Sequence, residues 1–396
     1  MRKGVKILII AWPCIHYGGA ERWWFYVLNE FRKFGNIYGI VAIPTALNLG
    51  CYSCPRHIKS SNIDVIYMYP VRNKLLEVFL WTRLLIKMIR KVGIDFIVAG
   101  YQTPIIALVT TLAGIVTRRK NYIVFHVPIG WLPYYRNESL RLSIINKLLI
   151  KIYEFVNKLG LGYFVLVSPS VRYDLERVNL NVYKYCSLKG AGITKSCDMK
   201  YRAYDDRDID IIHLASISKA KGIFDIPLIL RNIKEVFPNV KAIIIGRMPN
   251  DLKTELQKML KAYGIENNVN VLGYVDGCKK FELLSRSKVM IYPSYMDTFA
   301  ISVLEALSVG TPVVAYAIPA IALNYKTGAV MSVRIDDTKA MAKKTMEILS
   351  NKDHWARLSE EALAFSKSYN WTEIVNSLLM CIIRGLRDES INYFVT

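Results

Sequence analysis

Short apolar runs alternate with longer stretches of helical period along the first half of the chain. A charged start gives way to a continuous apolar run over residues 7–12, and a glycine turn leads from it into a helix beginning near Ala20. Unbroken apolar runs of this kind are typical of buried parallel strands. Further strands are predicted at residues 63–69, 95–100, 121–127 and 163–170. The alternation predicts a doubly wound α/β domain.

The same pattern restarts after a charged, loop-rich stretch at residues 196–210. Strands are predicted there at residues 209–215, 240–246, 269–275, 287–294 and 311–317. We therefore predict domains at residues 1–195 and 196–370, followed by an amphipathic helix within residues 371–396. In parallel sheets the carboxyl ends of the strands carry the binding loops, so two such domains are expected to face a central cleft.

Residues 96–117 form a stretch of 22 residues without a charge, which is long enough in principle to cross a membrane. Gly100, Gln102 and Pro104 divide it into a short strand-like run and a helix-like run. Pro104 would lie in the first turn of that helix, where its missing N–H is not needed. We predict a buried strand and helix here, and not a membrane span.

Positive charge is concentrated in the first half of the chain. The formal net charge is +21, and residues 1–195 hold 27 basic and 9 acidic side chains against 26 and 23 in residues 196–396. This asymmetry indicates a basic face that meets an anionic partner. Residues 74–91 and 141–158 are predicted as basic amphipathic helices, which are typical of membrane interfaces. We expect peripheral association with a membrane surface; nucleic acid is the alternative partner, although no nucleic-acid motif is recognisable.

The seven cysteines are scattered, and their odd number without a secretory leader predicts reduced thiols and a cytoplasmic location. For a membrane-associated protein this location is the inner face of the membrane. Cys51 and Cys54, with His57 nearby, resemble half of a metal site, but no second cluster completes it. Loop cysteines are the better interpretation, and we expect no metal.

Three turns could bind phosphate. In parallel α/β domains the free N–H groups and the helix dipole at a strand-to-helix turn favour an anion. Gly18 and Gly19 occupy such a turn in the first domain, and Lys221 stands at the corresponding turn of the second. The third turn precedes a helix predicted near residue 299, with Asp297 before it and Glu305 within it. A buried glutamate on an apolar helix is rare unless it is paired, which marks Glu305 as a functional candidate.

Residues 293–316, "PSYMDTFAISVLEALSVGTPVVAY", resemble the signature of glycosyltransferase family 4, which are retaining enzymes of the GT-B fold. That signature has Pro-Ser, an acid, Phe-Gly, Glu-Ala and Gly-x-Pro-Val-Val. Shorter matches follow the family's order at residues 18–22, 121–128, 220–225 and 368–371. The resemblance implies two Rossmann-like domains, an acceptor domain and a donor domain, and a C-terminal helix that crosses back to the first.

The resemblance also implies a nucleotide-diphosphate-sugar donor in the second domain. Glu305 would accept hydrogen bonds from the ribose hydroxyls and Asp297 from those of the transferred sugar, while His126 would face the sugar and the acceptor. No metal or cofactor is required when a lysine and helix N-termini stabilise the charge of the leaving group. The groups implied for the diphosphate belong to Gly18, Gly19, Lys221, Thr298, Phe299 and Ala300.

Three positions depart from the family pattern. Asp297 replaces the usual glutamate, Ala300 replaces the usual glycine, and Ser216 stands where an arginine is usual. Lys219 is the candidate replacement for that arginine, but lysine lacks the bidentate fork of a guanidinium. The leading hypothesis is a retaining glycosyltransferase with an acceptor hydroxyl, of which a lipid-linked one is a candidate. The alternatives are a sugar-nucleotide epimerase or catalytically weakened relative, and a nucleic-acid-binding or nucleic-acid-modifying protein.

Overall fold

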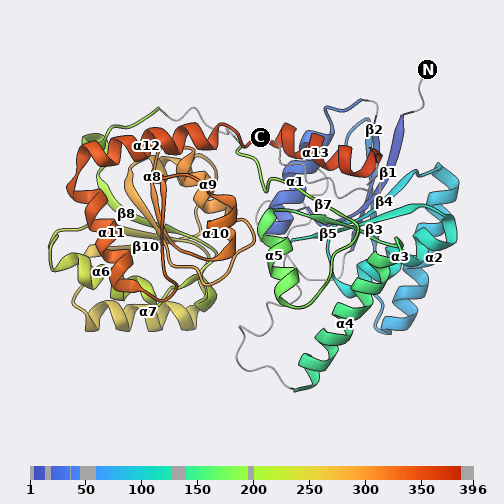
Figure 1. The fold of residues 1–396 in the computed structure, drawn as a ribbon, viewed down its shortest axis with the longest axis horizontal. Helices are drawn as coiled ribbons and strands as arrows, with labels where there is room; N and C mark the ends of the chain where they lie inside the picture. Colours follow the sequence, from blue (N-terminus) through green and yellow to red (C-terminus); the bar gives the residue numbers. More distant parts are fainter. Residues whose placement is uncertain are drawn as a thin grey trace. The chain divides into compact units, whose positions relative to one another are not determined.

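The computed structural model describes residues 4–13, 19–35, 37–44, 59–126, 140–194 and 200–384. The chain divides into two compact units: residues 1–191 together with 371–396, and residues 192–370. Each unit contains one parallel sheet with helices between its strands (Figure 1).

The first unit is built on a seven-stranded sheet in the order β3-β2-β1-β4-β5-β6-β7. Neighbouring strands are paired in parallel throughout. The apolar run near the N-terminus is the buried interior strand β1, with Leu8 paired with Ile40 on one side and Ile97 on the other. The elements are β1 (Val5–Ile10), α1 (Gly19–Phe31), β2 (Ile37–Pro44), β3 (Ile63–Met68), α2 (Lys74–Val92), β4 (Phe96–Ala99), α3 (Pro104–Thr117), β5 (Lys120–Phe125), α4 (Leu140–Lys158), β6 (Tyr163–Leu166), α5 (Pro169–Arg177) and β7 (Tyr185–Ser187).

The prediction for residues 96–117 is confirmed. They form β4 and α3, and Pro104 occupies the first turn of the helix. Gly100, directly after β4, allows close packing against the end of β1, because a Cβ there would lie 2.6 Å from the backbone oxygen of Ile10. Within the described part of the chain, every helix is too short or too polar to cross a membrane.

The last helix, α13 (Trp371–Arg384), belongs to the first unit. The ring of Trp371 stacks on that of Tyr26 in α1, with the centroids 5.1 Å apart. Thr372 donates a hydrogen bond of 2.6 Å to the carboxylate of Glu30. These contacts join two helices that are separated by more than 300 residues of sequence, so the second unit is an insertion between α13 and the rest of the first unit.

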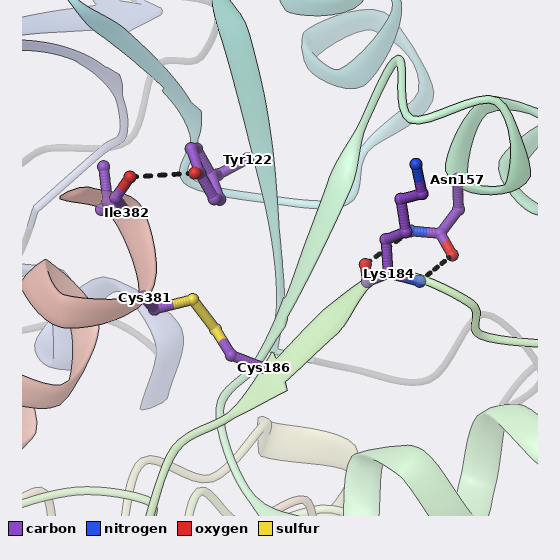
Figure 2. Close-up of a disulfide and its surroundings, with 6 residues drawn as sticks. All are labelled: Tyr122, Asn157, Lys184, Cys186, Cys381 and Ile382. Atoms are coloured by element: carbon purple, nitrogen blue, oxygen red, sulfur yellow. Dashed lines mark hydrogen bonds between the residues drawn. A yellow bond between two sulfur atoms is a disulfide. The ribbon is translucent and has the colours of Figure 1, made fainter. Parts of the chain in front are cut away.

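A disulfide links Cys186 of β7 to Cys381 of α13 (Figure 2). Tyr122 strengthens the same junction by donating a hydrogen bond of 2.9 Å to the backbone oxygen of Ile382. The prediction of reduced thiols is therefore wrong for these two cysteines, and Cys278 is disulfide-bonded as well. The spacing of 195 residues between Cys186 and Cys381 gives no hint of their contact, which depends on the return of α13 to the first unit.

The metal-site candidate of Cys51, Cys54 and His57 lies outside the described residues. Among the residues that the structure does describe, no three His, Cys, Asp or Glu side chains are grouped so that they could hold a metal ion.

The second unit has a six-stranded sheet in the order β10-β9-β8-β11-β12-β13. All of its paired strands are parallel. Its elements are β8 (Ile209–Leu214), α6 (Asp225–Lys234), β9 (Ala242–Ile245), α7 (Asn250–Ala262), β10 (Val269–Gly273), α8 (Gly277–Ser285), β11 (Ser287–Tyr292), α9 (Ile301–Leu307), β12 (Val313–Tyr316), α10 (Pro319–Asn324), β13 (Val330–Val333), α11 (Thr338–Ser350) and α12 (Lys352–Ser366).

Candidate functional site

The candidate site lies at the carboxyl edge of the second sheet, where the chain leaves β8 and β11. These two strands are direct neighbours, so the loops that follow them meet. A 3₁₀ turn, Lys219–Lys221, follows β8, and residues 293–300 lead from β11 into α9. The amide of Tyr295 donates a hydrogen bond of 3.0 Å to the backbone oxygen of Ala220, which fixes one loop against the other.

Gly222 makes this close approach possible. Its φ angle is 69°, in the left-handed region that glycine adopts without strain. A Cβ at Gly222 would lie only 1.9 Å from the backbone oxygen of Pro293. The glycine of the Lys-Gly pair is therefore required by packing, and it places the preceding lysine over the start of α9.

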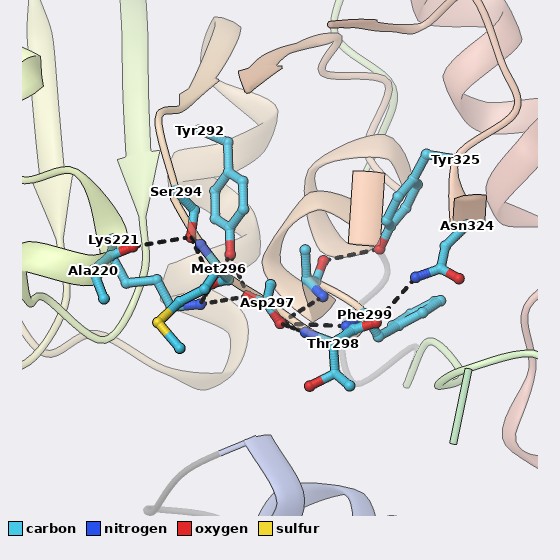
Figure 3. A network of polar contacts seen from close by, with 11 residues as sticks. Ala220, Lys221, Tyr292, Ser294, Met296, Asp297, Thr298, Phe299, Asn324 and Tyr325 are labelled. Atoms are coloured by element: carbon cyan, nitrogen blue, oxygen red, sulfur yellow. Dashed lines mark hydrogen bonds and ion pairs between the residues drawn. The ribbon is translucent and has the colours of Figure 1, made fainter. Parts of the chain in front are cut away.

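Lys221 and Asp297 form an ion pair, with 2.6 Å between Nζ and Oδ2 (Figure 3). The Lys221 ammonium also donates a hydrogen bond of 2.8 Å to the backbone oxygen of Met296. The hydroxyl of Tyr292 donates to the same Oδ2 atom of Asp297. Both members of the ion pair are mostly buried, and the fold brings these two residues, 76 positions apart, into direct contact.

The other carboxylate oxygen of Asp297, Oδ1, turns back onto the start of α9. It accepts hydrogen bonds from the amides of Thr298 at 2.7 Å, Phe299 at 3.3 Å and Ala300 at 3.0 Å. The three amides that the sequence assigned to a diphosphate thus converge on an anionic oxygen that the chain itself provides. The carboxylate of Asp297 therefore satisfies all three amides in this structure.

The local electrostatics favour a negative charge at this point. Burial by itself would raise the pKa of the Asp297 carboxyl, but the Lys221 charge and hydrogen bonds from Lys221, Tyr292 and the Ala300 amide lower it overall. The carboxyl is therefore ionised at neutral pH although it is removed from solvent. A site that stabilises a buried carboxylate in this way has the groups needed to hold a phosphate.

Ala300 adopts φ 61° and ψ 60°, a left-handed conformation that is uncommon for a residue with a Cβ. A glycine at this position would adopt this conformation without strain.

We expect Ala300→Gly to raise the free energy of unfolding by about 0.5–1 kcal/mol, because the relief of left-handed strain exceeds the entropy that glycine gains in the unfolded chain. The matched control is Ala306→Gly in α9, which should lower it by about 1 kcal/mol because that residue is in a regular helix. Urea unfolding of both variants measures the difference, and changes of the same sign would contradict the assignment.

Glu305 lies on α9 and is buried, with 8% of its surface exposed. Its Oε1 atom is 2.7 Å from the ammonium of Lys280 on α8. Lys280 is itself 3.1 Å from a carboxylate oxygen of Asp276. The pairing explains how an apolar helix tolerates a buried carboxylate. Sequence reasoning missed Lys280, because nothing distinguishes it from the adjacent Lys279, which is exposed and pairs with Glu282.

Ser216 and Lys219 do not join this cluster. Both are exposed, and within the described residues neither forms a hydrogen bond or ion pair with Asp297. The Lys219 ammonium lies 5.7 Å from the centre of the Phe224 ring.

The glycine pair belongs to the first unit. Gly18 lies outside the described residues. Gly19 is exposed at the start of α1, and a Cβ there would have no atom within 4 Å. The space around Gly19 is therefore open to a ligand, but it does not by itself require a glycine.

His126 follows β5 and is buried among aromatic rings of the first unit. Its ring centre is 5.1 Å from that of Trp23, 6.3 Å from that of Trp24 and 5.6 Å from that of Tyr101. Burial lowers the pKa of His126 to about 3, against a smaller opposing effect of a backbone hydrogen bond with Gly100. The imidazole is thus neutral at physiological pH, and it can exchange a hydrogen bond with a sugar but cannot serve as a cation there.

This low pKa predicts a pH-dependent stability. The unfolded chain binds a proton on His126 near pH 6.5 and the folded protein only near pH 3, so the free energy of unfolding should fall as pH drops through this window. Between pH 7.5 and 5.0 the loss is about 2 kcal/mol. Urea unfolding followed by tryptophan fluorescence measures it, since six of the seven tryptophans are in the first unit.

The His126→Phe variant should lose this contribution to the pH dependence. His213→Phe is the control, because His213 is buried in the second unit, where burial lowers its pKa to about 4. An unchanged pH dependence in His126→Phe would contradict the neutral, buried imidazole.

Two parallel-sheet α/β units, with a last helix that rejoins the first, define the GT-B fold, and solved structures confirm it. The superposition on the structure of HepE from Anabaena, in complex with UDP and glucose, covers 94% of this chain and 98% of the HepE chain. Its TM-score is 0.73 and the sequence identity is 16%. The superposition on sucrose-phosphate synthase from Thermosynechococcus elongatus covers 94% of this chain and 97% of that enzyme's chain, with a TM-score of 0.72 and 17% identity. At such identities the likeness shows the fold alone.

The family model of the group 1 glycosyl transferases matches residues 198–365, which include the whole candidate site. An uncharacterized glycosyltransferase of Methanocaldococcus jannaschii is 22% identical over 240 residues, 58% of this chain and 57% of that protein. The D-inositol 3-phosphate glycosyltransferase of Mycobacteroides abscessus is 27% identical over 168 residues, which are 41% of this chain and 37% of that protein. The match thus spans 57% and 37% of the lengths of these two relatives. It relates the second unit to group 1 glycosyl transferases, while the finer resemblance to family 4 stays a prediction.

Proposed function

We propose that this protein is a retaining glycosyltransferase that moves a sugar from a nucleotide-diphosphate donor to an acceptor hydroxyl. The observation that carries the proposal is the cluster of Lys221 and the amides at the start of α9, which holds the Asp297 carboxylate and offers the groups that stabilise an anion. Glu305 lies further along the same helix. The group 1 family match, which spans these residues, supports the same activity.

The chemistry follows from where charge develops. The bond between the anomeric carbon and the diphosphate oxygen breaks, and its electron pair leaves with the diphosphate. The acceptor oxygen bonds to the same face of that carbon, and its proton passes to the departing diphosphate. Lys221 and the α9 amides stabilise the developing negative charge. Once displaced from those amides, Asp297 is free to accept hydrogen bonds from the sugar hydroxyls.

The experiment incubates the protein with UDP-, GDP- and ADP-linked hexoses and measures release of the nucleoside diphosphate. We expect release from one donor class, increased by an acceptor alcohol, with the anomeric configuration of the product retained by NMR. We also expect release to persist in EDTA, because Lys221 and the amides supply the positive charge. No release from any donor would contradict the transferase, and an isomerised sugar nucleotide without release would instead identify an epimerase.

We further propose that α4 docks the first unit on an anionic lipid bilayer. Large apolar side chains recur along this helix every three or four residues, and each has between 47% and 62% of its surface exposed. This spacing places them in one stripe on one face of the helix. The residues are Leu148, Ile152 and Phe155 in α4, with Leu159 directly after its last residue.

Basic side chains adjoin this stripe, which supports an anionic partner. Three of the four apolar residues directly follow an exposed lysine: Lys147, Lys151 and Lys158. An apolar stripe beside lysines matches the boundary between the acyl chains and anionic headgroups of a membrane. The +18 surplus of residues 1–195 has the same sign. Association of this kind would bring the protein to a lipid-linked acceptor.

We expect Phe155→Glu to reduce co-sedimentation with vesicles of phosphatidylglycerol and phosphatidylcholine by about tenfold, because the variant loses apolar burial and adds a charge of the wrong sign. Val236→Glu is the matched control, since Val236 is equally exposed but lies in the second unit. Binding to pure phosphatidylcholine should be weak. Equal binding of both variants and the unchanged protein would contradict the α4 surface.

A further inference from the structure

We propose that Lys280 is a positioning residue that holds Glu305 ready for the ribose of the donor. This inference rests on the proposed function and adds to it a residue that controls recognition of the sugar of the nucleotide. The ammonium of Lys280 lies 2.7 Å from Oε1 of Glu305, and only 4% of the Lys280 side chain is exposed. A lysine so completely buried needs a reason, because burial of the charge is costly.

The ion pair fixes only one oxygen of the Glu305 carboxylate. Within the described residues, Oε2 accepts no hydrogen bond, although the residue is buried. Lys280 holds one oxygen of the Glu305 carboxylate, and the other oxygen is open. A carboxylate oxygen accepts hydrogen bonds and donates none, so the open oxygen suits a pair of hydroxyl donors. Vicinal hydroxyls of a ribose present that pair. Lys280 therefore supplies both the orientation and the compensating charge.

Lys280 is in turn anchored from the other side. Asp276, which precedes α8, lies 3.1 Å from the same ammonium. The hydroxyl of Tyr274 donates a hydrogen bond of 2.9 Å to the second carboxylate oxygen of Asp276. The ammonium is thus held between carboxylates of two segments, the turn before α8 and helix α9. Loss of Lys280 would release Glu305 without changing any group that the nucleotide itself touches.

Nucleotides that differ only at the ribose test this role. We would measure by calorimetry the affinity of the unchanged protein for UDP and GDP, and for their 2′-deoxy counterparts. A hydrogen bond to a charged acceptor corresponds to a preference of about tenfold or more for the ribose form. In Lys280→Met we expect the preference to fall below about threefold, mainly through weaker binding of the ribose form, while Lys280→Arg retains most of it.

Lys279→Met is the matched control, because Lys279 is the exposed neighbour on the same helix and pairs with Glu282. It should keep the full ribose preference. If the unchanged protein prefers ribose and Lys280→Met keeps that preference, the inference is overturned while the donor site stands. If neither UDP nor GDP binds the unchanged protein, the proposed function fails first, so the two failures are distinguishable.

A second variant keeps the test decisive if Lys280→Met does not fold. Glu305→Gln and the double variant Lys280→Met/Glu305→Gln remove the uncompensated glutamate charge. If Lys280 acts through Glu305, both variants should show the same residual ribose preference, because the second change adds nothing once the carboxylate is gone. A further loss in the double variant would show that Lys280 acts on the nucleotide by another route.

Discussion

Replacing Lys221 with methionine is expected to lower the rate of sugar transfer by about 10² to 10³-fold at saturating donor. Methionine keeps the length of the side chain but removes the only cationic side chain paired with Asp297 among the described residues. The diphosphate would then leave against the α9 amides alone. The measurement is kcat from release of the nucleoside diphosphate, compared with the unchanged protein.

Lys253→Met serves as the control, because Lys253 is an exposed lysine on α7 in the same unit. It should change kcat by less than about threefold. Circular dichroism and urea unfolding should show that Lys221→Met remains folded, since Asp297 keeps its hydrogen bonds from Tyr292 and the helix amides. A folded Lys221→Met variant with nearly full kcat would remove the lysine from the mechanism.

Gly222→Ala is expected to destabilise the second unit by about 3 kcal/mol or more. The added Cβ would lie 1.9 Å from the backbone oxygen of Pro293, and the φ angle of 69° adds left-handed strain. Because the second unit has 179 residues, the change corresponds to a fall in Tm of about 6–12 °C. Thermal unfolding measures it, and sugar transfer should fall as well because Lys221 moves with the turn.

Gly264→Ala separates the two causes. Gly264 has a φ angle of 62°, but a Cβ there would meet no atom within 4 Å. This variant should therefore show the strain alone, about 1–2 kcal/mol. If both glycine variants lose the same stability, the contact between Gly222 and Pro293 does not position the Lys221 turn.

Much of the fold could be predicted because buried parallel strands are visible as apolar runs. The strands β2 and β13 were not predicted, because polar or turn-forming residues interrupt the apolar pattern in them. In β2, Gly39 and Pro44 resemble turn residues, yet Gly39 packs closely in the strand, since a Cβ there would lie 3.3 Å from the Phe31 ring. The strand β13 has only the four residues Val330–Val333, one of them a serine, so its apolar run is too short to be recognised as a strand.

The candidate site shows a similar limit. The sequence identified Lys221 and Asp297, and their pairing follows from the parallel order of β8 and β11. The direction of the Asp297 carboxylate could not be predicted, since it depends on the left-handed backbone at Ala300. Lys280 was missed because burial, which distinguishes it from Lys279, arises only when α8 packs on α9.

The most direct test of the central claim is calorimetric titration of the protein with UDP- and GDP-sugars. The central claim is that the groups around the start of α9 bind the diphosphate of a donor. It predicts saturable binding of at least one of these donors with a Kd of about 1 μM to 1 mM, weakened at least tenfold in Lys221→Met. Absence of binding to every donor, or equal binding by the variant, would contradict it.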